Sequence, residues 1–346
     1  MDADALHAAA TVVDTHNDLL MLVAHRPAER QASYFRETWL PQLRAGGVDV
    51  QVLPVFVDDD FRPEGALRQT LRMIEAAHRL AEGNPEHVSL CRTGAEIDAA
   101  TASGRIALVL ALEGCEAVGV DVPILRTLFR LGVRMASFTH FGRTALADGS
   151  AEDAAGSRLT AAGVDALTLL EELGVVMDVS HLSAAGTDHV LSVARRPVVA
   201  SHSSAYELCR HHRNLTDERL KGIAATGGVV GVNFFYGFID PADPTVERLV
   251  DHVEHVASVA GIDHVGLGPD FVKEVFEQLT PPAAGPVDFE GLDGSRVIPG
   301  LDGPAGLPLV TAELCRRGWP EADVRKVLGD NWLRVLRATM GTPLAQ

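Results

Sequence analysis

The chain has 346 residues, 47% of them hydrophobic and 22% charged, and its formal net charge is −17 at pH 7. This composition excludes a disordered chain and supplies enough apolar side chains for a large core. The excess of acidic residues argues against nucleic acid or anionic membranes as partners, because such partners are bound through positively charged surfaces.

Eight short apolar runs, most of them rich in β-branched residues, predict eight strands. Several runs are almost continuously hydrophobic, as expected for parallel strands that are covered on both faces. In chain order the expected strands span residues 11–15, 48–55, 106–112, 133–138, 175–179, 197–201, 228–234 and 264–267.

Longer amphipathic segments separate these runs and predict helices. Ser183 directly follows an expected strand and Thr216 precedes an acidic residue, so both are candidate N-caps. The expected helices span residues 63–81, 159–173, 183–194, 217–225 and 245–260.

The alternation of strands and helices favours an α/β fold of the (β/α)8 barrel type, as a single domain over residues 1–346. A doubly wound open sheet is the alternative. Residues 271–305 are rich in proline and glycine. We interpret them as a long loop after the eighth strand rather than as a linker between domains.

Polar side chains that can bind a metal ion or transfer a proton follow six of the eight expected strands. The carboxyl ends of barrel strands converge on one face, where active sites are built. Histidines together with carboxylates suit a divalent cation, with zinc as the first choice. In chain order these residues are His16, Asp18, Glu113, His140, His181, His202 and Asp270.

Two of these strand ends give further evidence for a metal site. On a strand, residues two apart point the same way, so His16 and Asp18 can reach one metal ion together. Glu113 ends a run of seven apolar residues, where an unpaired buried carboxylate would be costly and a metal ion would stabilise it. A single histidine at a strand end is usually part of an ordinary core or loop, so the hypothesis depends on all of them converging.

Other chemically capable side chains are interpreted as structural. His252 and His255 lie three residues apart on an expected helix with no third ligand nearby, so we expect a solvated helix face. We expect His211 and His212 to be exposed or to lie beside the site. We expect the acidic run 58–60 to be a solvated loop, and we do not assign Cys115 as a nucleophile.

The four cysteines form no C-x-x-C pair, and reduced thiols in the cytoplasm are the simplest interpretation. The first residues contain no basic segment followed by an apolar one, and no apolar run reaches the roughly 18 residues of a membrane span. We therefore expect a cytoplasmic protein without a signal peptide or a transmembrane helix.

Seven segments of the chain together match the motifs of one known family. The most specific is SHSSAY at 201–206 followed by Arg213 and Asn214. The segments are VVDTHNDLL (12–20), LALEGCEAVG (110–119), SFTHFGRTALADG (137–149), MDVSHLS (177–183), PVVASHSSAYELCRHHRNLTDE (197–218), GIDHVGLGPDF (261–271) and GWPEADVRKVLGDNWLRVL (318–336). On these motifs, essentially the whole chain resembles the membrane (renal) dipeptidase family of zinc peptidases, peptidase family M19 of the amidohydrolase superfamily.

This resemblance implies a (β/α)8 barrel that holds two Zn2+ ions, bridged by Glu113 and by a water or hydroxide. By motif, His16, Asp18 and Glu113 would hold one zinc ion. Glu113, His181 and His202 would hold the other.

The resemblance also implies a dipeptidase that cleaves small dipeptides with a free C-terminal carboxylate, by attack of the metal-bridging hydroxide. Three residues match the family's substrate-handling positions. Asp270 would move the proton of the water to the leaving amine, His140 would hydrogen-bond the oxyanion, and Arg213 would bind the carboxylate. Dimers are common in the family, so a homodimer is a further expectation.

Two segments depart from the pattern common in the family. Residues 269–273 read PDFVK where many relatives read SDFDG, and the segment after His140 differs from the asparagine-containing version of relatives. A hydrolase of another small amide, a lactam or an N-acyl amino acid on the same binuclear centre is therefore the alternative function. A catalytically silent metal-binding protein is disfavoured, because Asp270 and Arg213 accompany the intact ligand set.

Overall fold

The structure, a computed structural model, describes residues 2–279, 291–294 and 296–344. Parallel strands form a curved sheet in the order β1-β2-β4-β5-β6-β7, and β8 pairs in parallel with β9. The bounds of these strands are β1 Val12–Asp14, β2 Val48–Phe56, β4 Ile106–Glu113, β5 Val133–Ser137, β6 Val176–Asp178, β7 Val198–Val199, β8 Val230–Val232 and β9 Val265–Leu267.

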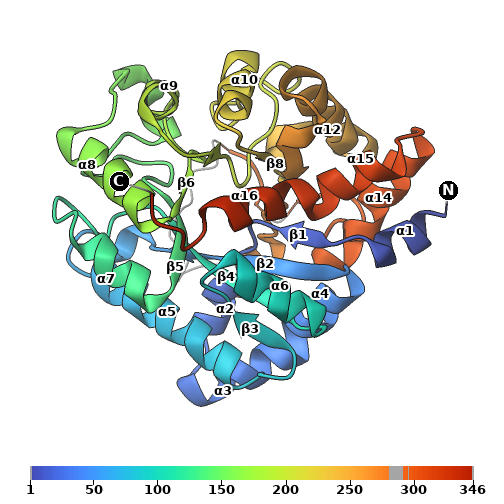
Figure 1. Cartoon of the computed structure of the whole chain (residues 1–346), viewed down its shortest axis with the longest axis horizontal. Coiled ribbons are helices and arrows are strands. Elements are labelled where there is room, and N and C mark those ends of the chain that lie inside the picture. Colours follow the sequence, from blue (N-terminus) through green and yellow to red (C-terminus); the bar gives the residue numbers. More distant parts are fainter. Residues whose placement is uncertain (1, 280–290, 295, 345–346) are drawn as a thin grey trace.

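Two backbone bridges join the sheets into one ring. Ala200, directly after β7, forms a parallel bridge with Val230 of β8. At the other seam Asn17, after β1, forms a parallel bridge with Phe271, after β9. The eight predicted strands therefore follow one another around a (β/α)8 barrel, and the predicted fold is confirmed (Figure 1).

One further strand is not among those that the sequence predicts. β3 (Val88–Leu90) pairs with the first residues of β4. It uses the same edge of β4 as β5, but β5 pairs with that edge only from Leu110 onward. It therefore lies outside the ring, as a short addition to the wall of the barrel, and does not change the number of barrel strands.

The five predicted helices are present, with ends that differ by at most a few residues. Ser183 is an N-cap as predicted, and its hydroxyl accepts from the backbone N–H of Gly186 at 3.1 Å. Thr216 occupies the N-cap position of α10, but its hydroxyl makes no capping hydrogen bond. The helices are α1 Ala3–Ala9, α2 Leu19–His25, α3 Ala28–Tyr34, α4 Leu40–Ala45, α5 Ala66–Glu82, α6 Gly94–Ala102, α7 Ile124–Leu131, α8 Ala161–Leu173, α9 Ala184–Val193, α10 Asp217–Ala225, α11 Tyr236–Ile239, α12 Val246–Ala260, α13 Lys273–Leu279, α14 Leu307–Arg316, α15 Glu321–Arg325 and α16 Asn331–Thr339.

The expectation of an irregular loop over residues 271–305 is wrong for its first part, which forms α13. The sequence KEVFEQL consists largely of residues with good helix propensity, and only the flanking segments are rich in proline and glycine. Residues 280–290 and 295 of this segment lie outside the described residues. In the part of the chain that the structure describes, no helix has the length and apolar character needed to cross a membrane.

Alternate residues of the strands pack on opposite faces of the barrel wall. On the inner face, Val52, Val109 and Val199 come from three different strands and belong to one buried cluster. On the outer face, Leu53 and Leu110 belong to the larger core between the strands and the helices. This alternation is the period of two that β-strands impose on side-chain direction.

The C-terminal helix α16 closes the barrel at the end where the strands begin, and it crosses the ring of strands in Figure 1. Trp332 packs on Gly266 of β9, where an added Cβ atom would lie 2.3 Å from the indole Nε1. Asn331 donates to the carbonyl of Val265 at 2.8 Å. The opposite end, where the strands finish, is left for the polar residues that the sequence singled out.

Candidate metal centre

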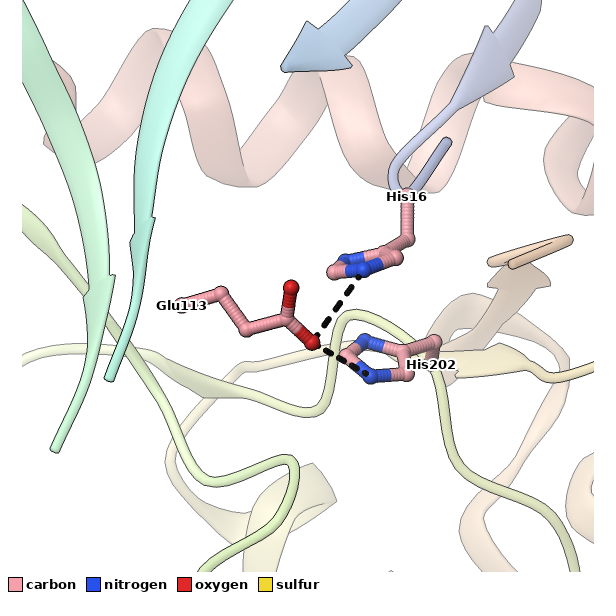
Figure 2. Close-up of side chains that lie close together, drawn as sticks. All are labelled: His16, Glu113 and His202. Carbon is pink, nitrogen blue, oxygen red and sulfur yellow. Dashed lines mark ion pairs between the residues drawn. The ribbon is translucent and has the colours of Figure 1, made fainter. Parts of the chain in front are cut away.

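The predicted strand-end residues converge at the mouth of the barrel. Glu113 is the last residue of β4, and its carboxylate lies between His16 and His202 (Figure 2). One oxygen, Glu113 Oε1, lies 3.1 Å from His181 Nε2, 3.4 Å from His16 Nε2 and 3.8 Å from His202 Nε2. Three imidazoles from three different strand ends therefore share one carboxylate oxygen.

Two more carboxylates extend the cluster on the side of β1. His16 Nε2 lies 3.8 Å from an oxygen of Asp18 and 3.8 Å from an oxygen of Asp270. His140 joins on the other side, since its ligating atom and those of Glu113 and His181 lie within 4.8 Å of one another. All seven predicted residues thus form one continuous cluster.

The donor atoms of this cluster fit a divalent cation. His16 Nε2 and Asp18 Oδ1 are buried without a hydrogen-bond partner in the described structure, although buried polar atoms are nearly always paired. The Nε2 atoms of His181 and His202 lie 2.7 Å apart, so at most one of them carries a proton between them. The remaining lone pairs and the carboxylate oxygens are the ligands that zinc and similar ions prefer.

The electrostatics of the cluster point the same way. Burial opposes protonation of His16, but the neighbouring carboxylates, Glu113 foremost, raise the pKa of His16 to about 10. Burial and the charge of Glu113 raise the pKa of Asp18 well above its usual range. Burial lowers the pKa of both His181 and His202. With Asp18, Glu113 and Asp270 all ionised, protonated His16 alone would not balance their charge, and bound cations would stabilise the ionised carboxylates.

Two residues of the cluster have a left-handed backbone, which is uncommon for residues other than glycine. His181 has φ of 69° and Asp270 has φ of 59°. The backbone N–H of Asp270 donates to the carbonyl of His16 at 2.9 Å, and the carbonyl of His181 accepts from Ser150 N–H at 2.7 Å. These hydrogen bonds hold the backbone of both residues in this conformation, as is typical of functional sites with local strain.

A serine and an aspartate orient His202 from behind. Ser201 Oγ donates to Asp178 Oδ2 and lies 2.7 Å from His202 Nδ1, so Nδ1 is the protonated nitrogen and donates to the serine. Asp178 Oδ1 in turn accepts from the backbone N–H groups of Ser180 and Ser201, both at 2.9 Å. This chain leaves the lone pair of His202 Nε2 directed into the cluster.

The chain Asp178–Ser201–His202 predicts an effect on metal affinity. We expect Ser201→Ala to weaken Zn2+ binding by about 10–100-fold, the usual effect of removing a group that orients a ligand. Titration of the metal-free protein with Zn2+ against a chromophoric chelator measures this. Ser192→Ala, at an exposed serine of α9, is the matched control and should bind Zn2+ as the wild type does. Unchanged affinity in Ser201→Ala would contradict the orienting role.

Asn233 belongs to the site although the sequence analysis did not select it. Its side-chain N–H donates to Asp270 Oδ2 at 2.8 Å, while its carbonyl oxygen accepts from the backbone N–H of Phe235 at 2.6 Å. Asn233 directly follows β8, the strand that corresponds to expected strand 228–234. The expected strand ran past Asn233 to residue 234, so Asn233 did not stand out as a residue at a strand end.

Arg213 is buried beside the cluster. Its guanidinium donates to the carbonyl of His202 at 3.0 Å and to Ser203 Oγ at 3.5 Å, and it faces the rings of Phe141 and Phe238. Among the described residues its Nε has no hydrogen-bond partner and no carboxylate lies within ion-pair distance of it. A buried guanidinium of this kind can bind a ligand carboxylate.

Two interpretations of the sequence need correction. His252 does not lie on a solvated face: its Nδ1 accepts from Ala205 N–H at 3.1 Å, and its Nε2 lies 3.1 Å from the carbonyl of Ile239. It therefore ties α12 to the loop that carries His202. Asp58, expected in a solvated loop, lines the pocket at the cluster.

The remaining groups agree better with expectation. His211 and His212 are partly exposed beside Arg213, and their rings stack at 4.4 Å. His255 lies 2.7 Å from Asp217 at the surface of α12. Cys115 is buried, and its thiol donates to the carbonyl of Ser137 at 3.2 Å.

A (β/α)8 barrel whose mouth gathers these donors has the architecture of a metal-dependent hydrolase. The sequence model of the membrane dipeptidase family, peptidase family M19, matches residues 1–281 and 286–343. The chain therefore belongs to this family, and the resemblance found in its motifs is confirmed.

Known proteins similar to this chain agree with the family. Dipeptidase verJ of Clonostachys rogersoniana is 33% identical over 275 residues, which are 78% of this chain but 65% of that protein, just under two thirds of its length. Dipeptidase AC, a metallopeptidase of family M19, has a structure that matches 96% of this chain and 99% of its own, with a TM-score of 0.84 and 27% identity. A metallopeptidase from Rhodobacter sphaeroides, liganded with a phosphinate mimic of the dipeptide L-Ala-D-Ala, matches 95% of this chain and 99% of its own, with a TM-score of 0.83 and 26% identity.

Proposed function

We propose that this protein is a dipeptidase that uses two divalent metal ions, with zinc expected, to hydrolyse small dipeptides with a free C-terminal carboxylate. The observation that carries the proposal is the group of three histidine nitrogens around Glu113 Oε1, with Asp18 and Asp270 beside it. The dipeptide mimic in the Rhodobacter sphaeroides relative supports this class of substrate.

The same residues provide for two ions. His16, Asp18 and Glu113 would hold one of them, and Glu113, His181 and His202 would hold the other, with Glu113 bridging. When bound, such ions lower the pKa of a water so that hydroxide exists near neutral pH, and they polarise the scissile carbonyl.

Asp270 moves the proton in this proposal. Asn233 holds Oδ2 of its carboxylate at 2.8 Å, which leaves Oδ1 directed toward His16 and the centre of the cluster. From there Asp270 Oδ1 takes a proton from the attacking water and delivers it to the nitrogen of the leaving amine.

His140 and Arg213 hold the substrate on either side of the scissile bond. Burial lowers the pKa of His140 to about 4, so its imidazole is neutral at pH 7 and can donate one N–H to the developing oxyanion. Arg213 stays protonated, since burial lowers its pKa only to about 10. Its planar guanidinium binds the C-terminal carboxylate of the dipeptide, which limits the substrate to one residue beyond the cleaved bond.

Metal analysis tests the binuclear part of the proposal. We expect two zinc ions per wild-type chain when the protein is saturated and washed, and fewer in Glu113→Ala, because the bridging carboxylate contributes to both positions. Elemental analysis by mass spectrometry gives the ratio directly. Glu152→Ala, at an exposed glutamate, is the control and should keep both ions. One ion per wild-type chain at saturation would contradict the proposal.

A further inference from the structure

An apolar pocket adjoins the cluster, and the proposed mechanism does not use it. Its floor includes Glu113, His140 and His181. Its walls are largely hydrophobic. The apolar side chains on the side of β1, β2 and β9 are those of Met21, Phe56, Val272, Val275, Phe276 and Leu279.

Helix α13 supplies half of this apolar wall. Val275, Phe276 and Leu279 stand at positions i, i+1 and i+4, so they share one face of the helix. The opposite face is held by hydrogen bonds, since Glu274 Oε1 accepts from the Gln42 side chain at 2.8 Å and Gln278 Oε1 accepts from the Tyr34 hydroxyl at 3.1 Å. α13 is therefore a fixed wall of the pocket.

The positions of the other substrate groups indicate which part of a dipeptide reaches this wall. Arg213, which receives the C-terminal carboxylate in the proposed function, lies on the loop after β7 and contacts the backbone of His202. α13 follows β9 and packs against α2, which follows β1. With the scissile carbonyl at Glu113 and the carboxylate at Arg213, the N-terminal residue extends toward α13.

We propose that α13 binds the side chain of the N-terminal residue, and that the enzyme selects dipeptides with a large apolar residue at that position. This inference rests on the proposed dipeptidase function. Burial of an apolar side chain against Val275, Phe276 and Leu279 stabilises the bound substrate and its transition state. The carboxylate of Asp58 lines the same pocket and repels an acidic N-terminal side chain.

Hydrolysis of a dipeptide series by the zinc-loaded enzyme tests the preference. We expect kcat/KM for Leu-Gly and Met-Gly to exceed that for Gly-Gly by about 10–100-fold, the range for filling an apolar subsite, and Asp-Gly to be the poorest substrate. Gly-Leu should gain much less over Gly-Gly. A preference that follows the C-terminal residue, or equal kcat/KM across the N-terminal series, would overturn the proposal.

A substitution in α13 distinguishes a change in substrate preference from a general loss of activity. Leu279→Ala should lower the ratio of kcat/KM between Leu-Gly and Gly-Gly by about 10-fold, because it removes most of one contacting side chain. Leu309→Ala makes the same change at an exposed leucine of α14 and should leave the ratio as in the wild type. An unchanged ratio in Leu279→Ala overturns the role of α13 alone, whereas no hydrolysis of any dipeptide overturns the proposed function and this inference with it.

Discussion

Replacement of Asp270 by asparagine is expected to lower kcat by about 10²–10⁴-fold while the protein keeps its metal ions. The carboxamide preserves the shape of the side chain and can still accept a hydrogen bond from Asn233, which donates to Oδ2 at 2.8 Å. It cannot accept and release a proton, and general acid–base catalysis is worth about this factor. Steady-state kinetics and elemental analysis on the same sample measure both quantities.

The control for this variant is Asp263→Asn, at an exposed aspartate ahead of β9 that pairs with Lys326. It should keep wild-type kcat. Asp270→Asn with full metal content and near-normal kcat would show that the proton moves by another group. Loss of metal in Asp270→Asn would instead give Asp270 a role as a ligand.

Arg213→Ala is expected to lower kcat/KM for dipeptides by roughly 30–1000-fold, as expected when a charged hydrogen-bonding partner of the substrate is removed. The effect should depend on the substrate carboxylate. Against a C-terminally amidated dipeptide the wild type should already be poor, and the substitution should reduce activity little further. The comparison of acid and amide substrates isolates the interaction between the guanidinium and the carboxylate.

The other role open to Arg213 is to hold its own loop, since it donates to the carbonyl of His202 and to Ser203 Oγ. In that case acid and amide substrates would lose activity equally and the Tm would fall. Arg213→Lys sharpens the test, because lysine keeps the charge but not the planar pair of donors. Arg210→Ala, at an exposed arginine of the same loop, should leave kcat/KM and the Tm unchanged.

The sequence predicted the barrel well because the signal for its strands is local. A run such as Ile106–Glu113 is hydrophobic at every position until its last residue, and each residue is buried in the structure. The missed strand, Val88–Leu90, has three residues, two of them half-buried, and its pairing depends on an edge of β4 that only the folded barrel provides. Helix α13 was hidden because its seven residues are surrounded by proline and glycine.

The side chains around the cluster were harder to predict than the cluster itself. His16 and Glu113 could be found because they end strands, and a barrel places strand ends together. Ser201 was missed because a serine beside a histidine has no distinctive spacing, and its hydrogen bonds depend on Asp178 of the neighbouring strand. His252 was assigned to the wrong face because the loop that covers it, at Ala205, is far away in the sequence.

The seam between β1 and β9 has a consequence for how the protein is made. His16 follows the first strand, whereas Asp270, whose N–H donates to the carbonyl of His16, follows the last one. Helix α16, still later in the chain, covers the far end of the same barrel. A nascent chain on the ribosome therefore carries its first proposed ligand long before it can close the ring. Complete assembly of the centre waits until nearly all of the polypeptide has been synthesised, and these distant contacts favour slow folding.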